Sequence, residues 1–161
     1  MTLAELIAEV YTITNRPDLV AQTLTAVRSA TLKIHQSDYY YKDIFETGVQ
    51  FLNSLYLQQI DYRTIVPRWR ALKYIRKTDI TGYSDGPILE VLGIPEMVED
   101  AYRINRNDVC YVAGEVVQIR SSTQLQYVIL GCYRNPDITQ AGYSSWVALD
   151  HPYAIVFEAA S

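Results

Sequence analysis

Apolar residues recur at helical spacing in the first turns of the chain. Leu3 and Ile7 are four positions apart, which places them on one face of a helix, while charged residues fall on the other faces. Thr2 and Glu5 are three positions apart, the spacing of a capping box that satisfies free backbone donors at a helix start. The pattern predicts a helix over residues 3–14.

A second apolar stripe begins shortly afterwards. Asn15 can cap a helix, and Pro17 suits a first helical turn. The pattern therefore predicts a helix over 16–36, joined to the first in a hairpin. His35 would end it as a surface or C-cap residue, where a cation suits the helix dipole. The apolar stripe consists of Val20, Leu24, Val27, Thr31 and Ile34.

The pattern changes after residue 38. All the glycines lie beyond this point, and β-branched and aromatic residues become frequent. Residues 46–60 and 88–92 are predicted as strands, and residues 108–134 as an antiparallel meander with turns at Ala113-Gly114 and at 121–123. The expected core residues of the first strand are Phe51, Leu55, Leu57 and Ile60. In the meander, alternation places Val117 and Ile119 on one face with Val128, Leu130 and Cys132.

The last residues predict a short helix that is apolar on nearly every side. Asp150 is the expected N-cap, and Pro152 lies in the first turn. A helix of this length needs packing partners, either in the core of its own domain or on another chain. The candidate subunit or portal contacts on this helix are Tyr153, Ile155, Val156 and Phe157.

Together these elements predict an α+β fold in a single domain of 161 residues. Residues 1–38 form the N-terminal helical hairpin, 39–150 the antiparallel β-rich body, and 151–161 the short C-terminal helix.

Composition excludes several classes of function. A net charge of −4 argues against binding of nucleic acid or anionic membranes by bulk charge. No apolar run reaches the ~18–20 residues of a membrane span. Cys110 and Cys132 have no metal-ligand spacing and are expected to be buried free thiols in a reducing compartment. Of the 14 tyrosines only Tyr11 precedes residue 38, and so many amphipathic rings favour contacts between proteins.

The densest charge lies between Asp61 and Asp79, a stretch without any acid. Arginine beside aromatic rings can hold phosphates or stack on bases, whereas a solvated basic face can meet an acidic neighbouring subunit. Both interpretations remain open, as does a plain solvated surface without a partner. The candidate partner or DNA contacts are Arg68, Trp69, Arg70, Tyr74, Arg76 and Lys77.

Catalytic constellations are weak in this sequence. Glu96, Glu99 and Asp100 could act as acid and base, but they fall in a predicted first helical turn beside no histidine. Ser144 and Ser145 lie near Asp150 and His151, yet an adjacent Asp-His pair suits a triad poorly and no nucleophile elbow frames either serine. We expect no enzyme activity, no cofactor and no metal site.

The order of parts resembles the head-to-tail connector (adaptor) proteins of tailed bacteriophages. The resemblance covers most of the chain and lies in the order of its segments, not in a catalytic motif. The segments are Leu3-Ala-Glu-Leu-Ile, Thr14-Asn-Arg-Pro-Asp-Leu-Val, Leu24-Thr-Ala-Val-Arg, the His35 region, Tyr39-Tyr-Tyr-Lys-Asp-Ile-Phe, Pro67-Arg-Trp-Arg, Gly131-Cys-Tyr-Arg-Asn-Pro, Trp146 and Pro152-Tyr-Ala-Ile.

This resemblance implies a structural virion protein, made in the host cytoplasm and placed at the head-tail junction. It implies a homo-oligomeric, commonly dodecameric ring that joins the portal to tail or neck proteins. Double-stranded DNA would pass through the lumen without sequence-specific binding, and no membrane is involved. The alternatives are a nucleic-acid-binding accessory protein that uses residues 63–77, and an enzyme that uses Glu96 and Asp100.

Overall fold

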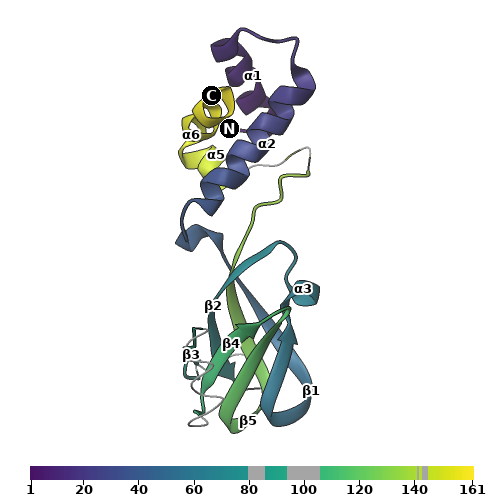
Figure 1. Ribbon diagram of the computed structural model, residues 1–161, viewed down its shortest axis with the longest axis vertical. Helices are drawn as coiled ribbons and strands as arrows, with labels where there is room; N and C mark the ends of the chain where they lie inside the picture. The colour runs from purple at the N-terminus through teal and green to yellow at the C-terminus, as the bar shows by residue number, and fades with distance from the viewer. Residues whose placement is uncertain (80–85, 94–105, 141, 143–144) are drawn as a thin grey trace. The chain divides into compact units, whose positions relative to one another are not determined.

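The computed structural model describes residues 1–79, 86–93, 106–140, 142 and 145–161. It confirms the predicted α+β class, with two N-terminal helices, a five-stranded sheet and short C-terminal helices (Figure 1). The chain divides into two compact units. We call Met1–Asp43 with Asn135–Ser161 the helical unit, and Ile44–Arg134 the sheet unit.

The helical unit joins the two ends of the chain. Its four α-helices are α1 (Leu3–Thr14), α2 (Val20–Gln36), α5 (Trp146–Asp150) and α6 (Pro152–Ala160). Helix α6 packs against both α1 and α2 (Figure 1). Residues 146–150 are therefore helical and belong with the N-terminal helices, not with the β-rich body to which the sequence pattern assigned them. The buried core consists of Leu3, Leu6, Val10, Val27, Ala30, Val147, Ala148, Ile155 and Val156.

The start of α1 is as predicted. Thr2 Oγ1 accepts a hydrogen bond from the Glu5 backbone N–H at 3.3 Å, and Glu5 Oε2 accepts one from the Thr2 backbone N–H at 2.8 Å. Asn15, however, ends α1 in the left-handed conformation at φ 52° and does not cap α2. Asparagine suits both positions, so the local sequence is ambiguous here. Helix α2 begins at Val20, later than the predicted residue 16.

The buried face of α2 differs in part from the predicted stripe. Val27 and Thr31 are buried as expected, but Val20 is exposed at the first position of the helix. Thr31 tolerates burial because its hydroxyl donates to the Val27 carbonyl oxygen at 2.7 Å. The buried positions of α2 are Thr23, Val27, Ala30, Thr31 and His35.

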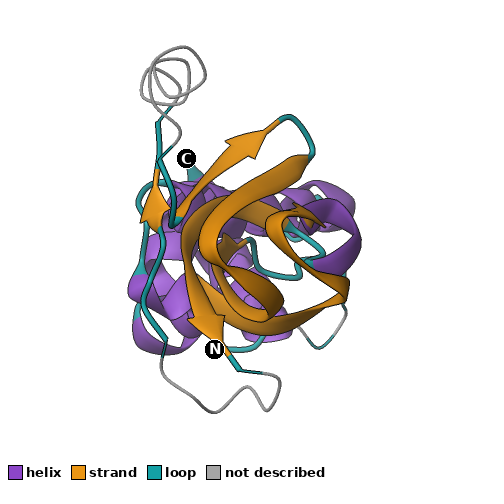
Figure 2. Ribbon diagram, turned by 90° about the horizontal axis from the view of Figure 1, so that it is seen from below, coloured by secondary structure: helices purple, strands orange, loops and turns teal. Residues whose placement is uncertain are grey.

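The sheet unit is a curled, mostly antiparallel sheet (Figure 2). Its strands are β1 (Ile44–Asp61), β2 (Trp69–Thr78), β3 (Glu90–Val91), β4 (Val109–Ala113) and β5 (Val116–Arg134). The strand order is β1-β5-β4-β3, with β2 also paired to β5, and only the β3–β4 pair is parallel. A short helix, α3 (Tyr62–Ile65), follows β1. The predicted strand at 88–92 is thus present in shorter form.

The predicted turn at 121–123 is wrong, because β5 runs continuously through it. Its pairing with β1 is irregular here, with register shifts between Gln50 and Leu55 and between Leu55 and Leu57. The first shift leaves extra residues on β1, and the second leaves extra residues, 121–124, on β5. Such bulges bend a strand without ending it and reverse the alternation of its side chains. Leu55 and Leu57 are consequently exposed, and their assignment to the core was wrong.

The core of the sheet unit contains most of the other predicted residues. Phe51 and Ile60 are buried, and Val117, Ile119, Val128, Leu130 and Cys132 share one cluster, as alternation predicted. Cys110 and Cys132 are buried free thiols, as expected. Burial raises the pKa of Cys110 to about 12 and that of Cys132 to about 11, so both stay protonated and unreactive.

A network of polar side chains connects β2 with the residue before β4 and with β5. Lys77 is buried, and its ammonium group donates to Asp108. Asp108 also accepts hydrogen bonds from the backbone N–H and hydroxyl of Ser122, both at 3.0 Å to Oδ1. The Lys77 bond, followed by the Ser122 bonds, lowers the pKa of Asp108 from 3.8 to about 2. The carboxylate is thereby stabilised in its charged form.

Asp108→Asn is expected to destabilise the protein in a pH-dependent way. The folded-state pKa of Asp108 is depressed, so its contribution is present above about pH 4 and is lost as pH falls towards 2. Because the side chain is 44% exposed, solvent screening limits the contribution to about 1 kcal/mol. Urea unfolding at several pH values should show wild type and variant differing near neutrality and converging near pH 2. A difference that stays constant over this range would contradict the assignment.

In the described part of the chain, no helix is both long and apolar enough to cross a membrane.

Candidate functional site

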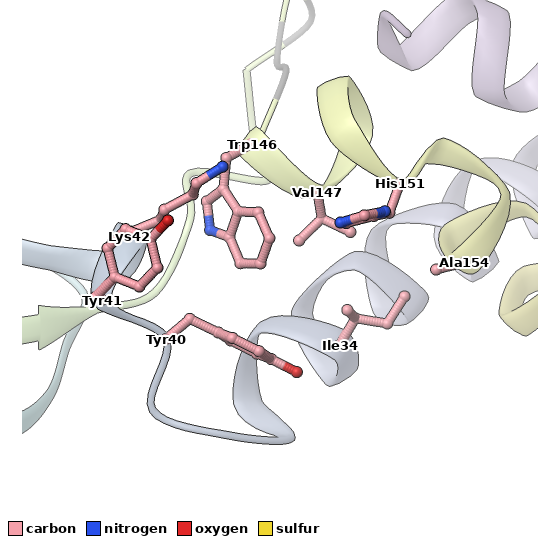
Figure 3. Close-up of a pocket in the computed structure, with 8 residues that line it drawn as sticks. All are labelled: Ile34, Tyr40, Tyr41, Lys42, Trp146, Val147, His151 and Ala154. Atoms are coloured by element: carbon pink, nitrogen blue, oxygen red, sulfur yellow. The ribbon is translucent and has the colours of Figure 1, made fainter.

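The helical unit carries a hollow of about 410 Å³ whose walls are largely aromatic (Figure 3). Three segments form it: the end of α2, residues 40–42, and the junction of α5 with α6. Figure 3 shows Tyr41 and Lys42 at one end, Trp146 projecting between them and Tyr40, and His151 and Ala154 at the other end. We call it the ring-lined hollow. Its lining residues are Ile34, Tyr40, Tyr41, Lys42, Trp146, Val147, His151 and Ala154.

A buried hydrogen-bond cluster fixes the Trp146 wall of the hollow. Asp43 Oδ1 accepts from His35 Nδ1 at 2.8 Å and from Trp146 Nε1 at 2.7 Å. The imidazole and indole rings also meet edge to face, with centroids 5.4 Å apart. His35 and Asp43 are both buried, and the C-cap of α2 is Ser37, so the prediction of a surface or C-cap histidine was wrong. One carboxylate thus orients two rings from distant parts of the sequence.

The charged groups around the hollow are already paired. Lys42 Nζ lies 5.3 Å from the Trp146 ring centroid and donates to Asp150. This bond raises the pKa of Lys42 and lowers that of Asp150. Asp150 is therefore paired with Lys42. The sequence predicted Asp150 as the N-cap of α6, but the N-cap residue is His151, which makes no side-chain capping hydrogen bond. Lys33 likewise pairs with Glu158 on α6.

Helix α6 presents apolar side chains on two faces. Ile155 and Val156 are completely buried in the core of the helical unit. Tyr153 and Phe157 are 49% and 62% exposed, and their ring centroids lie 5.9 Å apart. We call these two residues the ring pair. Of the four interface candidates on this helix, the ring pair is accessible, whereas the other two serve the core.

The ring pair borders a second, shallower hollow that meets the first. His151 and Ala154 line both hollows, so the ring pair and the ring-lined hollow adjoin on one surface of the helical unit. The second hollow is lined by Asp150, His151, Pro152, Tyr153, Ala154 and Phe157.

The structure divides the basic segment between different environments. Lys77 was a candidate contact with a partner or with DNA, but its side chain is buried against Asp108. Trp69 stacks on Tyr62 with centroids 4.4 Å apart, and the Tyr74 ring covers Gly131 so closely that a Cβ there would lie 2.5 Å from it. These two rings are therefore engaged within the sheet unit.

The arginines of the segment are more accessible. Arg68 is exposed and has a positive φ of 63°, while Arg70 and Arg76 are half-buried. Arg63 is ion-paired with Glu115. A contact of Arg68, Arg70 or Arg76 with a partner or with DNA stays a prediction.

The catalytic candidates gain little from the structure. Ser145 Oγ accepts from the Ala148 backbone N–H at 3.2 Å and so acts as the N-cap of α5. Ser144, Glu96, Glu99 and Asp100 lie outside the described residues. Among the residues described, no group of three His, Cys, Asp or Glu side chains is placed to hold a metal ion.

No protein-family model matches this sequence, and comparison with curated proteins finds no match. The function is therefore inferred from the surface features of the helical unit.

Proposed function

We propose that this protein is a structural adaptor at the head-tail junction of a tailed bacteriophage, forming a ring between the portal and the tail. The order of its segments, which resembles that of connector proteins, suggests the role. The observation that carries it is the two-faced α6, whose Ile155 and Val156 complete the core while Tyr153 and Phe157 remain exposed to solvent. Exposed aromatic rings on an anchored helix are typical of residues that dominate protein interfaces.

Exposed apolar side chains of the sheet unit support an assembly role as well. Leu52, Leu55, Tyr56 and Leu57 are all exposed on β1, around the bulges of that strand. Large apolar residues clustered on a surface usually mark a contact with another macromolecule. A subunit of a closed ring has two neighbours and thus needs two such surfaces.

The proposal predicts a stoichiometric complex with portal rings. The protein would be mixed with the portal protein encoded in the same genome and imaged by electron microscopy. We expect a collar of adaptor subunits on one end of the portal ring. The double variant Tyr153→Ser, Phe157→Ser should reduce collar occupancy at least ~30-fold, because it removes two aromatic anchors. Adaptor and portal that remain unmixed at high concentration would overturn the proposal.

A further inference from the structure

We propose that the ring-lined hollow of one copy receives the ring pair of a second copy, so that two free molecules associate about a two-fold axis. This goes beyond the proposed function and does not depend on it. The hollow and the ring pair are both features of the helical unit and adjoin at His151 and Ala154.

The chemistry of the hollow selects a neutral aromatic occupant. Lys42 already lies over Trp146, so the face of the ring that would attract a cation most is taken by a cation of the chain itself. Asp150 neutralises Lys42, so an anion gains no net attraction. The remaining walls are rings and aliphatic groups, with Tyr40 meeting Trp146 edge to face at 5.2 Å. Neutral rings pack well against such walls.

The ring pair supplies an occupant of this kind. Tyr153 and Phe157 are neutral, exposed rings one turn apart on α6, with their centroids 5.9 Å apart. Their pairing reduces the entropy lost when they are inserted, because each restricts the rotamers of the other. Helix α6 holds their backbone in place through its buried face.

The placement of the two features favours mutual insertion. Two copies related by a two-fold axis bury the same patch on each, so a patch must be complementary to itself. Here two exposed rings and a hollow adjoin on one surface, so a half-turn can set the rings of each copy against the hollow of the other. Charges at the edge do not oppose this, since Lys42–Asp150 and Lys33–Glu158 are paired within each copy.

The test measures mass in solution by analytical ultracentrifugation over a range of concentrations. We expect the sedimenting species of the wild-type chain to have twice the 18.4 kDa mass of the monomer. Phe157→Ser should weaken the dimer at least ~100-fold, because each dimer loses two buried rings. Ala154→Arg should weaken it similarly by filling the hollow. Val20→Ser, a change at an exposed apolar residue elsewhere on the helical unit, is the matched control and should leave the dimer intact.

A mixture of the two variants gives the decisive measurement. Phe157→Ser keeps its hollow and Ala154→Arg keeps its ring pair, so a mixed dimer regains one of the two insertions. We expect the mixture to dimerise measurably where each variant alone is monomeric. Both positions are exposed, and unchanged circular dichroism and melting will show that the variants fold. A wild-type monomer at all concentrations, or a mixture no more associated than its components, would overturn the proposal. Portal binding is measured separately, so failure here leaves the adaptor role untouched.

Discussion

Alanine in place of Asp43 is expected to lower the free energy of unfolding of the helical unit by about 3 kcal/mol. The carboxylate accepts hydrogen bonds from His35 Nδ1 and Trp146 Nε1; His35 and Asp43 are buried, and Trp146 is half-buried. Removing this shared acceptor costs about 1–3 kcal/mol for a buried donor, and less for the half-buried Trp146. Urea unfolding followed by circular dichroism and by Trp146 fluorescence would measure the loss.

Asp43→Asn is the matched control for this prediction. Its amide oxygen can still accept both hydrogen bonds, so we expect a loss of about 1 kcal/mol, reflecting weaker, uncharged acceptance. His35→Ala in the same series should cost less than Asp43→Ala, because the bond to Trp146 survives. If Asp43→Ala unfolds within about 0.5 kcal/mol of wild type, the cluster does not stabilise this unit, and the fixed wall of the hollow loses its explanation.

The sequence predicts elements well where the signal is local. The capping box at Thr2 and Glu5 forms as expected, because its hydrogen bonds join neighbours in the chain. Asn15 shows the limit of local signals, since the same side chain suits the end of one helix and the start of the next. Alternation predicted the buried residues in both halves of β5, because each half alternates regularly, although the phase changes between Leu125 and Val128.

Errors arise where a distant segment decides the outcome. Polar residues at 121–123 looked like a turn, but they are the extra residues of an irregularity within the continuous strand β5, where its register with β1 shifts. The same bulges move Leu55 and Leu57 to the surface, and no pattern within β1 alone reports its register.

The site was harder to predict than the fold. His35 is bonded to a residue eight positions away, and that residue is bonded to Trp146, which is 103 positions from it. The residues next to His35 give no signal that Asp43 and Trp146 join it in a cluster, so its position at the end of a helix decided the interpretation. Aromatic richness at 39–41 was a visible signal, but only folding brings Tyr40 and Tyr41 beside Trp146 to make a hollow.

The two faces of α6 are expected to respond to truncation in opposite ways. Ile155→Ala removes a completely buried side chain from the core of the helical unit and should cost about 3 kcal/mol, the sum of lost burial and a residual cavity. Phe157→Ala, on the exposed face of the same helix, should change the free energy of unfolding by less than about 0.5 kcal/mol in dilute solution, where no partner covers the ring. Both variants keep helix propensity high, so the contrast reports burial and not helix formation. Equal losses would mean that Phe157 is a core residue, whereas a costly Ile155 and a neutral Phe157 would show that the exposed ring contributes nothing to the fold and is available to a partner.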